Sequence, residues 1–227
     1  MRFSGIEKTS LVDYPDRVSS VLFTPGCNLR CPYCHNWRIV LNPKGPFMSE
    51  ETAIKILKSR MRYIDAVVIT GGEPTIYPDL PNFIKRLKDE GFSVKLDTNG
   101  LSPDILLKCI PNLDYVAVDV KTSLEKYAKL GAGKAEIRNL VRTINILKED
   151  IVDYEFRNTA VPYFVEEADV LKIGELVKGG KRFAFQQFVP GDTLDEQFRN
   201  VRPHPPEKIL RFGEIMKEYV NEVIMRV

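Results

Sequence analysis

Short apolar runs alternate with longer amphipathic segments along most of the chain. The runs are rich in β-branched residues, as the buried strands of a parallel sheet are. Between them, apolar residues recur every three or four positions, which predicts helices that bury one face. The expected strands cover 18–23, 66–70, 93–98, 115–120, 154–161 and 183–189. The expected helices cover 49–64, 79–90, 135–148, 166–178 and 205–223, and another begins at 102.

This alternation of strand and helix predicts an α/β fold with parallel strands. Six strand–helix units are fewer than the eight of a closed barrel, which is typically ~250 residues long. In 227 residues the pattern favours a partial (β/α)6 barrel, and a doubly wound open sheet is the alternative. Because no long linker interrupts the alternation, we expect a single domain over 1–227, with a loop at 24–47 after the first strand.

Composition and charge limit the partners and the cellular compartment that can be expected for this protein. Hydrophobic residues make up 44% of the chain and charged residues 28%, close to the average of globular domains. The net charge of +2 creates no strong field for nucleic acid or an anionic membrane, so neither is an expected partner. No apolar run approaches the roughly 20 residues that span a bilayer, and the first residues lack a signal-peptide core. We therefore expect a cytoplasmic protein.

Glycine and polar residues gather at or directly after the carboxyl ends of the expected strands, except for one segment, residues 157–159, that lies within the fifth strand. Each such segment taken alone is an ordinary turn or a solvated loop charge. In a parallel α/β barrel, however, the carboxyl ends of the strands meet at one mouth, where active sites form. Their recurrence at the same end of successive strands therefore predicts one shared site. The segments are Gly71-Gly72-Glu73-Pro74, Asp97-Thr98-Asn99-Gly100, Asp119-Val120-Lys121, Arg157-Asn158-Thr159, Gln186-Gln187 and Val189-Pro190-Gly191-Asp192.

Three of the four cysteines, Cys27, Cys31 and Cys34, lie in the loop after the first strand. Clustered thiols in a chain of this kind indicate metal or redox chemistry instead of a disulfide framework. The chain has only two histidines, His35 and His204, too few for most catalytic zinc sites, so an iron–sulfur cluster suits the thiols better. Cys109 has apolar helical neighbours and is expected to be a buried small hydrophobe.

These residues carry a resemblance to a known family. The segment Cys27-Asn28-Leu29-Arg30-Cys31-Pro32-Tyr33-Cys34, followed by Gly-Gly-Glu-Pro after the next strand, resembles the pattern of radical S-adenosylmethionine enzymes. More narrowly, residues 3–15 resemble the start of anaerobic ribonucleoside-triphosphate reductase activating proteins. So do Cys34-His35-Asn36, Leu96-Asp97-Thr98-Asn99-Gly100 and Val118-Asp119-Val120-Lys121.

The resemblance implies a 4Fe–4S cluster held by Cys27, Cys31 and Cys34, with S-adenosylmethionine on the iron that these cysteines leave open. It implies that an electron passed through the cluster cleaves S-adenosylmethionine to methionine and a 5′-deoxyadenosyl radical. In such activases this radical removes a hydrogen atom from a glycine α-carbon of a glycyl-radical enzyme. The implied partner here is anaerobic ribonucleotide reductase.

Further cofactor contacts follow from the same resemblance. Gly71 and Gly72 would let the backbone approach the methionine moiety, and Glu73 would orient that loop or the amino group. Asp97, Thr98 and Asp119 match residues that surround the cofactor carboxylate and a bound monovalent cation in pyruvate formate-lyase activases. The other implied cofactor-binding residues are Tyr33 at the adenine, Asn36, Pro74, Asn99, Lys121 and Arg157.

The chain also departs from the related formate-lyase activases. Those proteins carry a histidine after the sixth strand, whereas residues 188–192 contain none and His204 lies too far along to replace it. Beyond the three clustered cysteines only Cys109 remains, so a second cluster is excluded. Electrons are therefore expected from an external donor such as ferredoxin or flavodoxin.

Two other functions remain open. The first keeps the radical chemistry and replaces the protein substrate by a small molecule or a modified nucleoside, which would require a closed pocket with specific polar groups. The second is a non-catalytic zinc module, which the absence of a fourth nearby cysteine or histidine ligand disfavours.

Overall fold

The computed structural model describes residues 1–41 and 43–227, so residue 42 of the expected loop 24–47 lies outside the described residues. The chain forms two compact units whose segments alternate along the sequence. The first unit comprises Met1–Asn28, Asn36–Thr98 and Ser102–Val116, and the second comprises Leu29–His35, Asn99–Leu101 and Ala117–Val227. A single domain over 1–227 stays a prediction.

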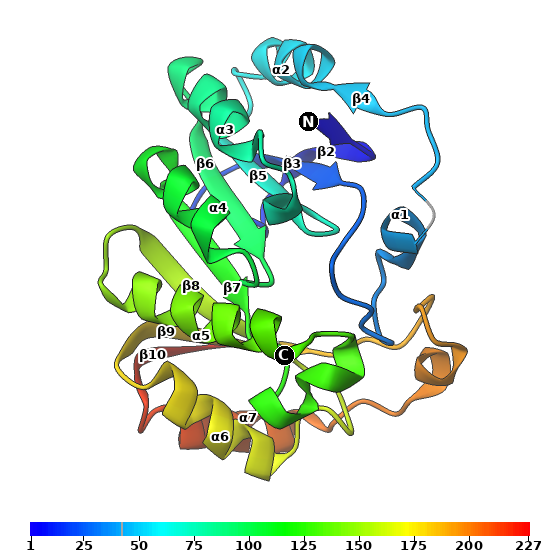
Figure 1. Cartoon of the computed structure of the whole chain (residues 1–227), viewed down its shortest axis with the longest axis vertical. Helices are drawn as coiled ribbons and strands as arrows, with labels where there is room; N and C mark the ends of the chain where they lie inside the picture. Colours follow the sequence, from blue (N-terminus) through cyan, green and yellow to red (C-terminus); the bar gives the residue numbers. More distant parts are fainter. Residues whose placement is uncertain (42) are drawn as a thin grey trace. The chain divides into compact units, whose positions relative to one another are not determined.

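Three parallel strands form the centre of the first unit (Figure 1). They are β3 (Ser19–Thr24), β5 (Ala66–Gly71) and β6 (Ser93–Thr98), with β5 in the middle. Apolar residues of β5 are fully buried from Ala66 to Ile69, which accounts for the continuous apolar run in the sequence. The register pairs Thr24 with Gly71, so β3 and β5 end side by side.

Three helices of the first unit follow its strands as the sequence predicts, although the first of them ends at Ser59 and not at the expected residue 64. They are α2 (Glu50–Ser59), α3 (Leu80–Asp89) and α4 (Pro103–Cys109). Ser49 caps α2 by accepting a hydrogen bond from the Thr52 amide at 3.2 Å, and proline opens α4 at its first turn. Short 3-10 helices, η1 (Pro74–Ile76) and η2 (Ile110–Asn112), complete the connections.

The first unit also contains elements that the periodicity does not predict. The edge strand β2 (Gly5–Ser10) pairs antiparallel with β3, and β1 (Arg2–Phe3) pairs with β4 (Met48–Ser49). β2 exposes most of its side chains, so it lacks the apolar run that marks a buried strand. Within the expected loop 24–47, a short helix α1 (Trp37–Leu41) buries Val40.

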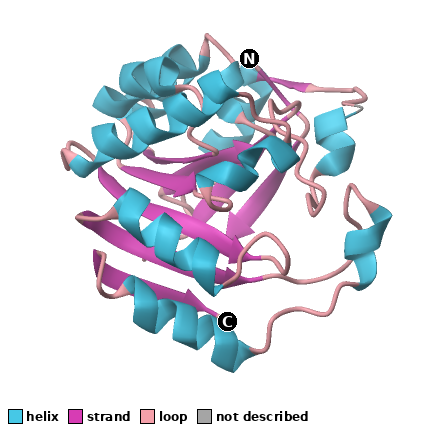
Figure 2. Ribbon diagram, turned by 60° about the horizontal axis from the view of Figure 1, so that its bottom comes forward, coloured by secondary structure: helices cyan, strands magenta, loops and turns pink. Residues whose placement is uncertain are grey.

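In the second unit, β8 (Asp153–Ala160), β9 (Gly180–Gln187) and β10 (Val220–Arg226) are parallel, with β9 in the middle. Its helices are α5 (Lys134–Lys148), α6 (Glu167–Val177) and α7 (Pro206–Met216), with the 3-10 helices η3 (Leu124–Leu130) and η4 (Glu196–Asn200). The strand β7 (Tyr115–Asp119) begins in the first unit and ends in the second. Figure 2 shows the helices in cyan and the strands in magenta.

The expected final helix over 205–223 is wrong in its second half. The helix ends at Met216, and residues 220–226 form the parallel strand β10. Apolar residues at 216, 220 and 223 keep a helical spacing, which hides the change from the sequence pattern. The two terminal guanidinium nitrogens of Arg226 donate to the buried carboxylate of Glu155, at 3.0 and 2.7 Å. This charge pairing adds to the strand hydrogen bonds that hold β10 in place.

The α/β class with parallel strands is confirmed in both units. Among the described residues, none of the helices combines the length and the apolarity that a bilayer-spanning segment requires.

Candidate functional site

The ends of β3 and β5 in the first unit approach each other through glycine. The Gly72 amide donates to the Thr24 carbonyl oxygen at 2.8 Å, and the Glu73 amide donates to the Gly26 carbonyl oxygen at 2.9 Å. A Cβ on Gly71 would lie 2.5 Å from the Thr24 nitrogen, and a Cβ on Gly72 would lie 1.8 Å from the Gly26 oxygen. Backbone packing therefore requires glycine at both positions, a reason that the sequence interpretation did not supply.

Asn36 ties the far end of the cysteine segment to the same place. Its side-chain Nδ2 donates to the Gly71 carbonyl oxygen at 2.9 Å. Asn36 also begins the turn into α1, because its carbonyl oxygen accepts from the amides of Ile39 and Val40. The side chain expected at the cofactor thus has a structural contact with one of the two glycines.

Glu73 is a buried carboxylate that organises the loop after β5. Its Oε1 accepts from the Thr75 amide at 3.0 Å, from the Thr75 hydroxyl at 2.6 Å and from the Thr98 hydroxyl at 2.7 Å. The first two bonds cap η1, which Pro74 opens, and the third reaches the end of β6. Glu73 therefore fixes two of the glycine- and acid-rich segments against each other, and its role toward the cofactor stays a prediction.

Asp97, beside Thr98 on β6, is paired with a residue that sequence reasoning missed. The Lys95 ammonium donates to Asp97 Oδ1 at 2.5 Å, and both side chains are buried. The Lys95 nitrogen also lies 5.9 Å from the centre of the Tyr115 ring. Lys95 and Asp97 are two positions apart on a strand and therefore share a face, which was the available signal.

In the second unit, a tight turn and a neighbouring loop position Cys31 and Cys34. The Cys34 amide donates to the Cys31 carbonyl oxygen at 3.1 Å. The amides of Leu194 and Asp195 donate to the carbonyl oxygens of Cys34 and Pro32 at 3.1 and 2.8 Å. The loop before η4 therefore holds the backbone of the cysteine segment in place. The sequence of this loop does not predict that role.

Tyr33 lies in an aromatic cluster of the same unit. Its ring centre is 5.2 Å from that of Phe164 and 6.1 Å from that of Phe198. Burial raises the pKa of the Tyr33 phenol well above its usual value, so the phenol stays protonated. Tyr33 thus offers an apolar body and a protonated hydroxyl.

Asp119 is the centre of a charge cluster in the second unit. Its carboxylate accepts from Arg157 Nε at 2.7 Å and from Lys121 Nζ at 3.1 Å. Burial would raise the pKa of Asp119, but the two cations outweigh it and hold that pKa far below its usual value. Although burial opposes it, the Asp119 carboxylate in turn raises the pKa of Lys121 well above normal. All three groups are therefore charged at neutral pH.

This cluster also acts on Cys31. Burial raises the pKa of the Cys31 thiol, and the Lys121 ammonium is the main influence that lowers it. Tyr127, which the sequence did not single out, positions Lys121 because its hydroxyl accepts from the Lys121 amide at 2.9 Å. A cation near a buried thiol favours the thiolate, the form that ligates metal.

Asn99 has a local structural contact. Its Oδ1 accepts from the Leu101 amide at 3.1 Å, which closes the turn after β6. The Nε2 atom of His35 lies 3.0 Å from the Val189 carbonyl oxygen. His204 is buried with its Nε2 2.8 Å from the Val165 carbonyl oxygen, so it anchors the segment before α7 to the start of α6.

The four cysteines form no disulfides among the described residues and lie in different settings. Cys27 belongs to the first unit and is half-buried, whereas Cys31 and Cys34 belong to the second. Within residues 1–41 and 43–227, no group of three His, Cys, Asp or Glu side chains is arranged to hold a metal ion. The donor set nevertheless suits an iron–sulfur cluster, since none of its three thiols is in a disulfide and the Lys121 cation acts on Cys31. The triad as cluster ligands stays a prediction.

Cys109 is confirmed as a core residue. It is fully buried in the last turn of α4, and burial raises the pKa of its thiol to about 12. It is therefore a neutral thiol at physiological pH, in keeping with the expected small hydrophobe of the core.

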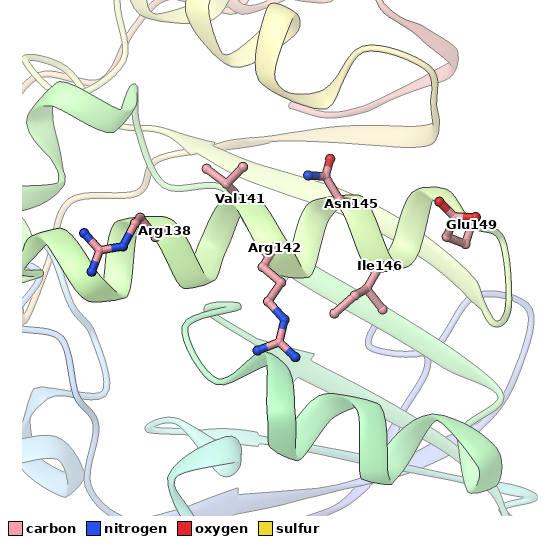
Figure 3. Close-up of a pocket in the computed structure, with 6 residues that line it drawn as sticks. All are labelled: Arg138, Val141, Arg142, Asn145, Ile146 and Glu149. Carbon is pink, nitrogen blue, oxygen red and sulfur yellow. The ribbon is translucent and has the colours of Figure 1, made fainter.

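A shallow pocket on α5 contains none of the predicted site residues (Figure 3). Its lining consists of Arg138, Val141, Arg142, Asn145, Ile146 and Glu149.

Replacing Asp119 or Lys121 by alanine should weaken S-adenosylmethionine binding about tenfold or more without unfolding the chain. Each change removes the charge-assisted hydrogen bond between Lys121 and Asp119 and alters the balance of fixed charges in the cluster, which Arg157 shares. Equilibrium binding and thermal unfolding check the two parts of this expectation. Lys172→Ala, which breaks an exposed pair with Glu125, is the control. Unchanged affinity in both variants, with the cluster intact, would make them ordinary loop charges.

Residues 21–177 match the protein-family model described as the Radical SAM superfamily. A Methanocaldococcus jannaschii protein bearing the name of a glycyl-radical enzyme activating enzyme is 41% identical, covering 98% of this chain and 95% of its own length. The pyruvate formate-lyase-activating enzyme of Clostridium pasteurianum is 26% identical, covering 97% of this chain and 98% of its own. That of Staphylococcus aureus is 30% identical, covering 76% and 74%.

Solved structures show the same fold at low identity. TYW1 with a bound lysine-pyruvate adduct superposes with a TM-score of 0.65 and 20% identity, covering 88% of this chain and 73% of that one. Streptococcus suis SuiB bound to S-adenosylmethionine gives 0.68 and 13%, covering 91% and 52%. A domain of a Bacteroides vulgatus pyruvate-formate lyase-activating enzyme gives 0.57 and 15%, covering 71% and 99%.

Proposed function

This chain belongs to the radical S-adenosylmethionine superfamily and, within it, to the glycyl-radical enzyme activating enzymes, and we propose that its partner is anaerobic ribonucleoside-triphosphate reductase. It is an oxidoreductase whose cofactors are a 4Fe–4S cluster and S-adenosylmethionine, and it acts on a glycyl-radical enzyme. The identity of that enzyme is the proposed part.

The observation that carries the choice of partner is the opening segment, residues 3–15, which resembles activating proteins of this reductase. In the structure, Ser10 organises its turn by accepting from the amides of Val12 and Asp13 at 3.2 and 3.1 Å. Leu11 and Val12 are 74% and 88% exposed, so the core does not require these apolar residues. Their exposure supports a role for the segment in contact with another protein.

The cluster ligands are proposed to be Cys27, Cys31 and Cys34. When bound, the cluster supplies the electron that cleaves S-adenosylmethionine to methionine and the 5′-deoxyadenosyl radical. The chain's own part is to hold the three thiolates and to position the cofactor, for which Glu73 organises the loop after β5 and the Asp119 cluster supplies fixed charges. Since only Cys109 remains beyond these three cysteines, too few for a second cluster, the electron is proposed to come from an external donor of the ferredoxin or flavodoxin type.

The substrate is proposed to be a glycine in a mobile segment of the reductase. A glycine α-carbon has no side chain to shield its hydrogen, and flanking amide groups stabilise the radical that remains. The C–H bond breaks so that the hydrogen atom passes to the 5′-deoxyadenosyl radical, giving 5′-deoxyadenosine and a glycyl radical. Ordering such a segment costs free energy, so binding of the isolated segment should be weak and docking should use further surface.

Anaerobic incubation of the holoenzyme with the reductase, S-adenosylmethionine and a strong reductant tests the proposal. We expect an electron paramagnetic resonance signal of a glycyl radical on the reductase. If the reductase carries deuterium at its glycine α-positions, deuterium should appear in 5′-deoxyadenosine. A pyruvate formate-lyase-type partner serves as the comparison.

Transfer of deuterium from that comparison partner alone would reassign the partner within the family. Labelling of 5′-deoxyadenosine by a small metabolite, with none from either protein, would favour the alternative of a small-molecule substrate.

A further inference from the structure

The first unit contains an ion pair that is removed from solvent at the end of β6. The Lys95 side chain is 2% exposed and that of Asp97 is 8% exposed, and the ammonium donates to Asp97 Oδ1 at 2.5 Å. A buried carboxylate with one partner removed is costly, whereas a matched pair keeps both charges satisfied. The pair is built into the strand, because residues two apart on a strand point to the same face.

Asp97 is one of the residues that the resemblance places around a monovalent cation and the cofactor carboxylate. Sodium or potassium is held by oxygen atoms whose negative charge is not neutralised by other groups. Here the chain's own ammonium occupies Asp97 Oδ1, so a metal cation beside it would meet a like charge in a poorly solvated place. The residues present therefore do not fit the implied cation.

In the second unit, Asp119, the other carboxylate that the resemblance places at the cation, is likewise paired with positive side chains of the chain itself. Asp119 accepts from both Arg157 and Lys121, so two fixed cations face its single negative charge. Neither carboxylate offers the uncompensated charge that attracts a metal cation. Two separate observations thus point the same way.

We propose that Lys95 is a tethered counterion that takes the place of a monovalent metal cation at Asp97, so this enzyme binds S-adenosylmethionine without sodium or potassium. Lys95 is accordingly a positioning residue: it fixes the Asp97 carboxylate and balances its charge. The part of this inference that concerns the cofactor rests on the proposed position of Asp97 beside it. The part that concerns the cation rests only on the contact between Lys95 and Asp97.

The first test compares sodium, potassium and choline chlorides at equal ionic strength. For the wild-type holoenzyme, S-adenosylmethionine affinity should agree within about twofold in the three salts, since choline is too large to enter a carboxylate site. A severalfold loss of affinity in choline would overturn the proposal.

The second test removes the internal cation with Lys95→Met, which keeps most of the side-chain length. We expect the affinity of this variant to fall about tenfold in choline and to recover in sodium or potassium, because Asp97 then recruits a cation from solution. The matched control is Lys88→Met, which breaks the half-exposed Lys88–Asp114 pair of the same unit and should create no such dependence.

A stability measurement keeps the proposal testable if Lys95→Met binds no cofactor. The melting temperature of this variant should be higher in sodium or potassium than in choline, while wild type and Lys88→Met show no difference between the salts. The double variant Lys95→Met/Asp97→Asn lacks both charges and should also lose the dependence on the cation. A Lys95→Met protein whose melting temperature and affinity are the same in all three salts would show Lys95 to be only a core residue.

Rescue of stability by the cation without any effect on cofactor affinity would leave the counterion role standing and remove Asp97 from the cofactor site. A failure of the counterion role of Lys95 can therefore be told apart from a failure of the proposed position of Asp97 at the cofactor.

Discussion

Alanine at Cys27, Cys31 or Cys34 should abolish the cluster and with it all cleavage of S-adenosylmethionine, whereas Cys109→Ala should retain both. Three thiolates are the full set of protein ligands proposed for the cluster, so the loss of one leaves too few to hold four irons. Cys109 is fully buried in the last turn of α4 and lies outside the segment that carries the three clustered cysteines. Iron content, visible absorbance of the anaerobic protein and 5′-deoxyadenosine formation measure the three consequences.

The Cys109 variant is the matched control, because it also removes one thiol from the chain. It should lose only about 1 kcal/mol of unfolding free energy, the usual cost of a small defect in a core. A cluster-free Cys109→Ala protein, or a triad variant that still cleaves the cofactor, would contradict the assignment of ligands.

The strands that the sequence predicts are those whose burial is continuous. Residues 66–69 form a fully buried apolar run, and Val94 and Leu96 are fully buried within 93–98, so β5 and β6 are predicted correctly. β2 escapes prediction because an edge strand exposes Glu7, Lys8 and Thr9 and needs no alternation. β10 escapes because its apolar spacing also fits a helix, and only its pairing with β9 decides between the two.

The site shows a similar division. Motif spacing identifies Glu73 and Thr98 as candidate site residues. It does not predict that the Thr98 hydroxyl donates to Glu73, because the two residues are far apart along the chain. Lys95 escapes attention because a lysine in a strand is ordinarily a solvated side chain, and only the structure shows it buried on Asp97. The periodicity of apolar residues predicts which side chains of one helix or strand are buried. It does not predict which polar side chains then contact each other.

Gly72→Ala is expected to destabilise the chain by about 3 kcal/mol or more and to disrupt cofactor binding. The added Cβ would lie 1.8 Å from the Gly26 carbonyl oxygen and 2.7 Å from its carbon, both backbone atoms that no rotamer change can move. Relief requires β5 to separate from the segment that begins the cysteine loop, which breaks the bonds from the Gly72 and Glu73 amides to Thr24 and Gly26. The Glu73 carboxylate would shift with them. Chemical denaturation measures the stability, and equilibrium binding measures the affinity.

Gly5→Ala is the control that separates this close contact from a general effect of replacing glycine. Gly5 lies in the edge strand β2 of the same unit, and a Cβ built on it meets no atom within 4 Å. This variant should keep wild-type affinity and change the unfolding free energy by less than about 1 kcal/mol, since alanine restricts the unfolded chain more than glycine does. If Gly72→Ala were as stable as Gly5→Ala and still bound S-adenosylmethionine, the approach of β5 to the cysteine loop would not be what holds this end of the site. Loss of affinity in Gly72→Ala at unchanged stability would instead place the methyl group in the path of the cofactor.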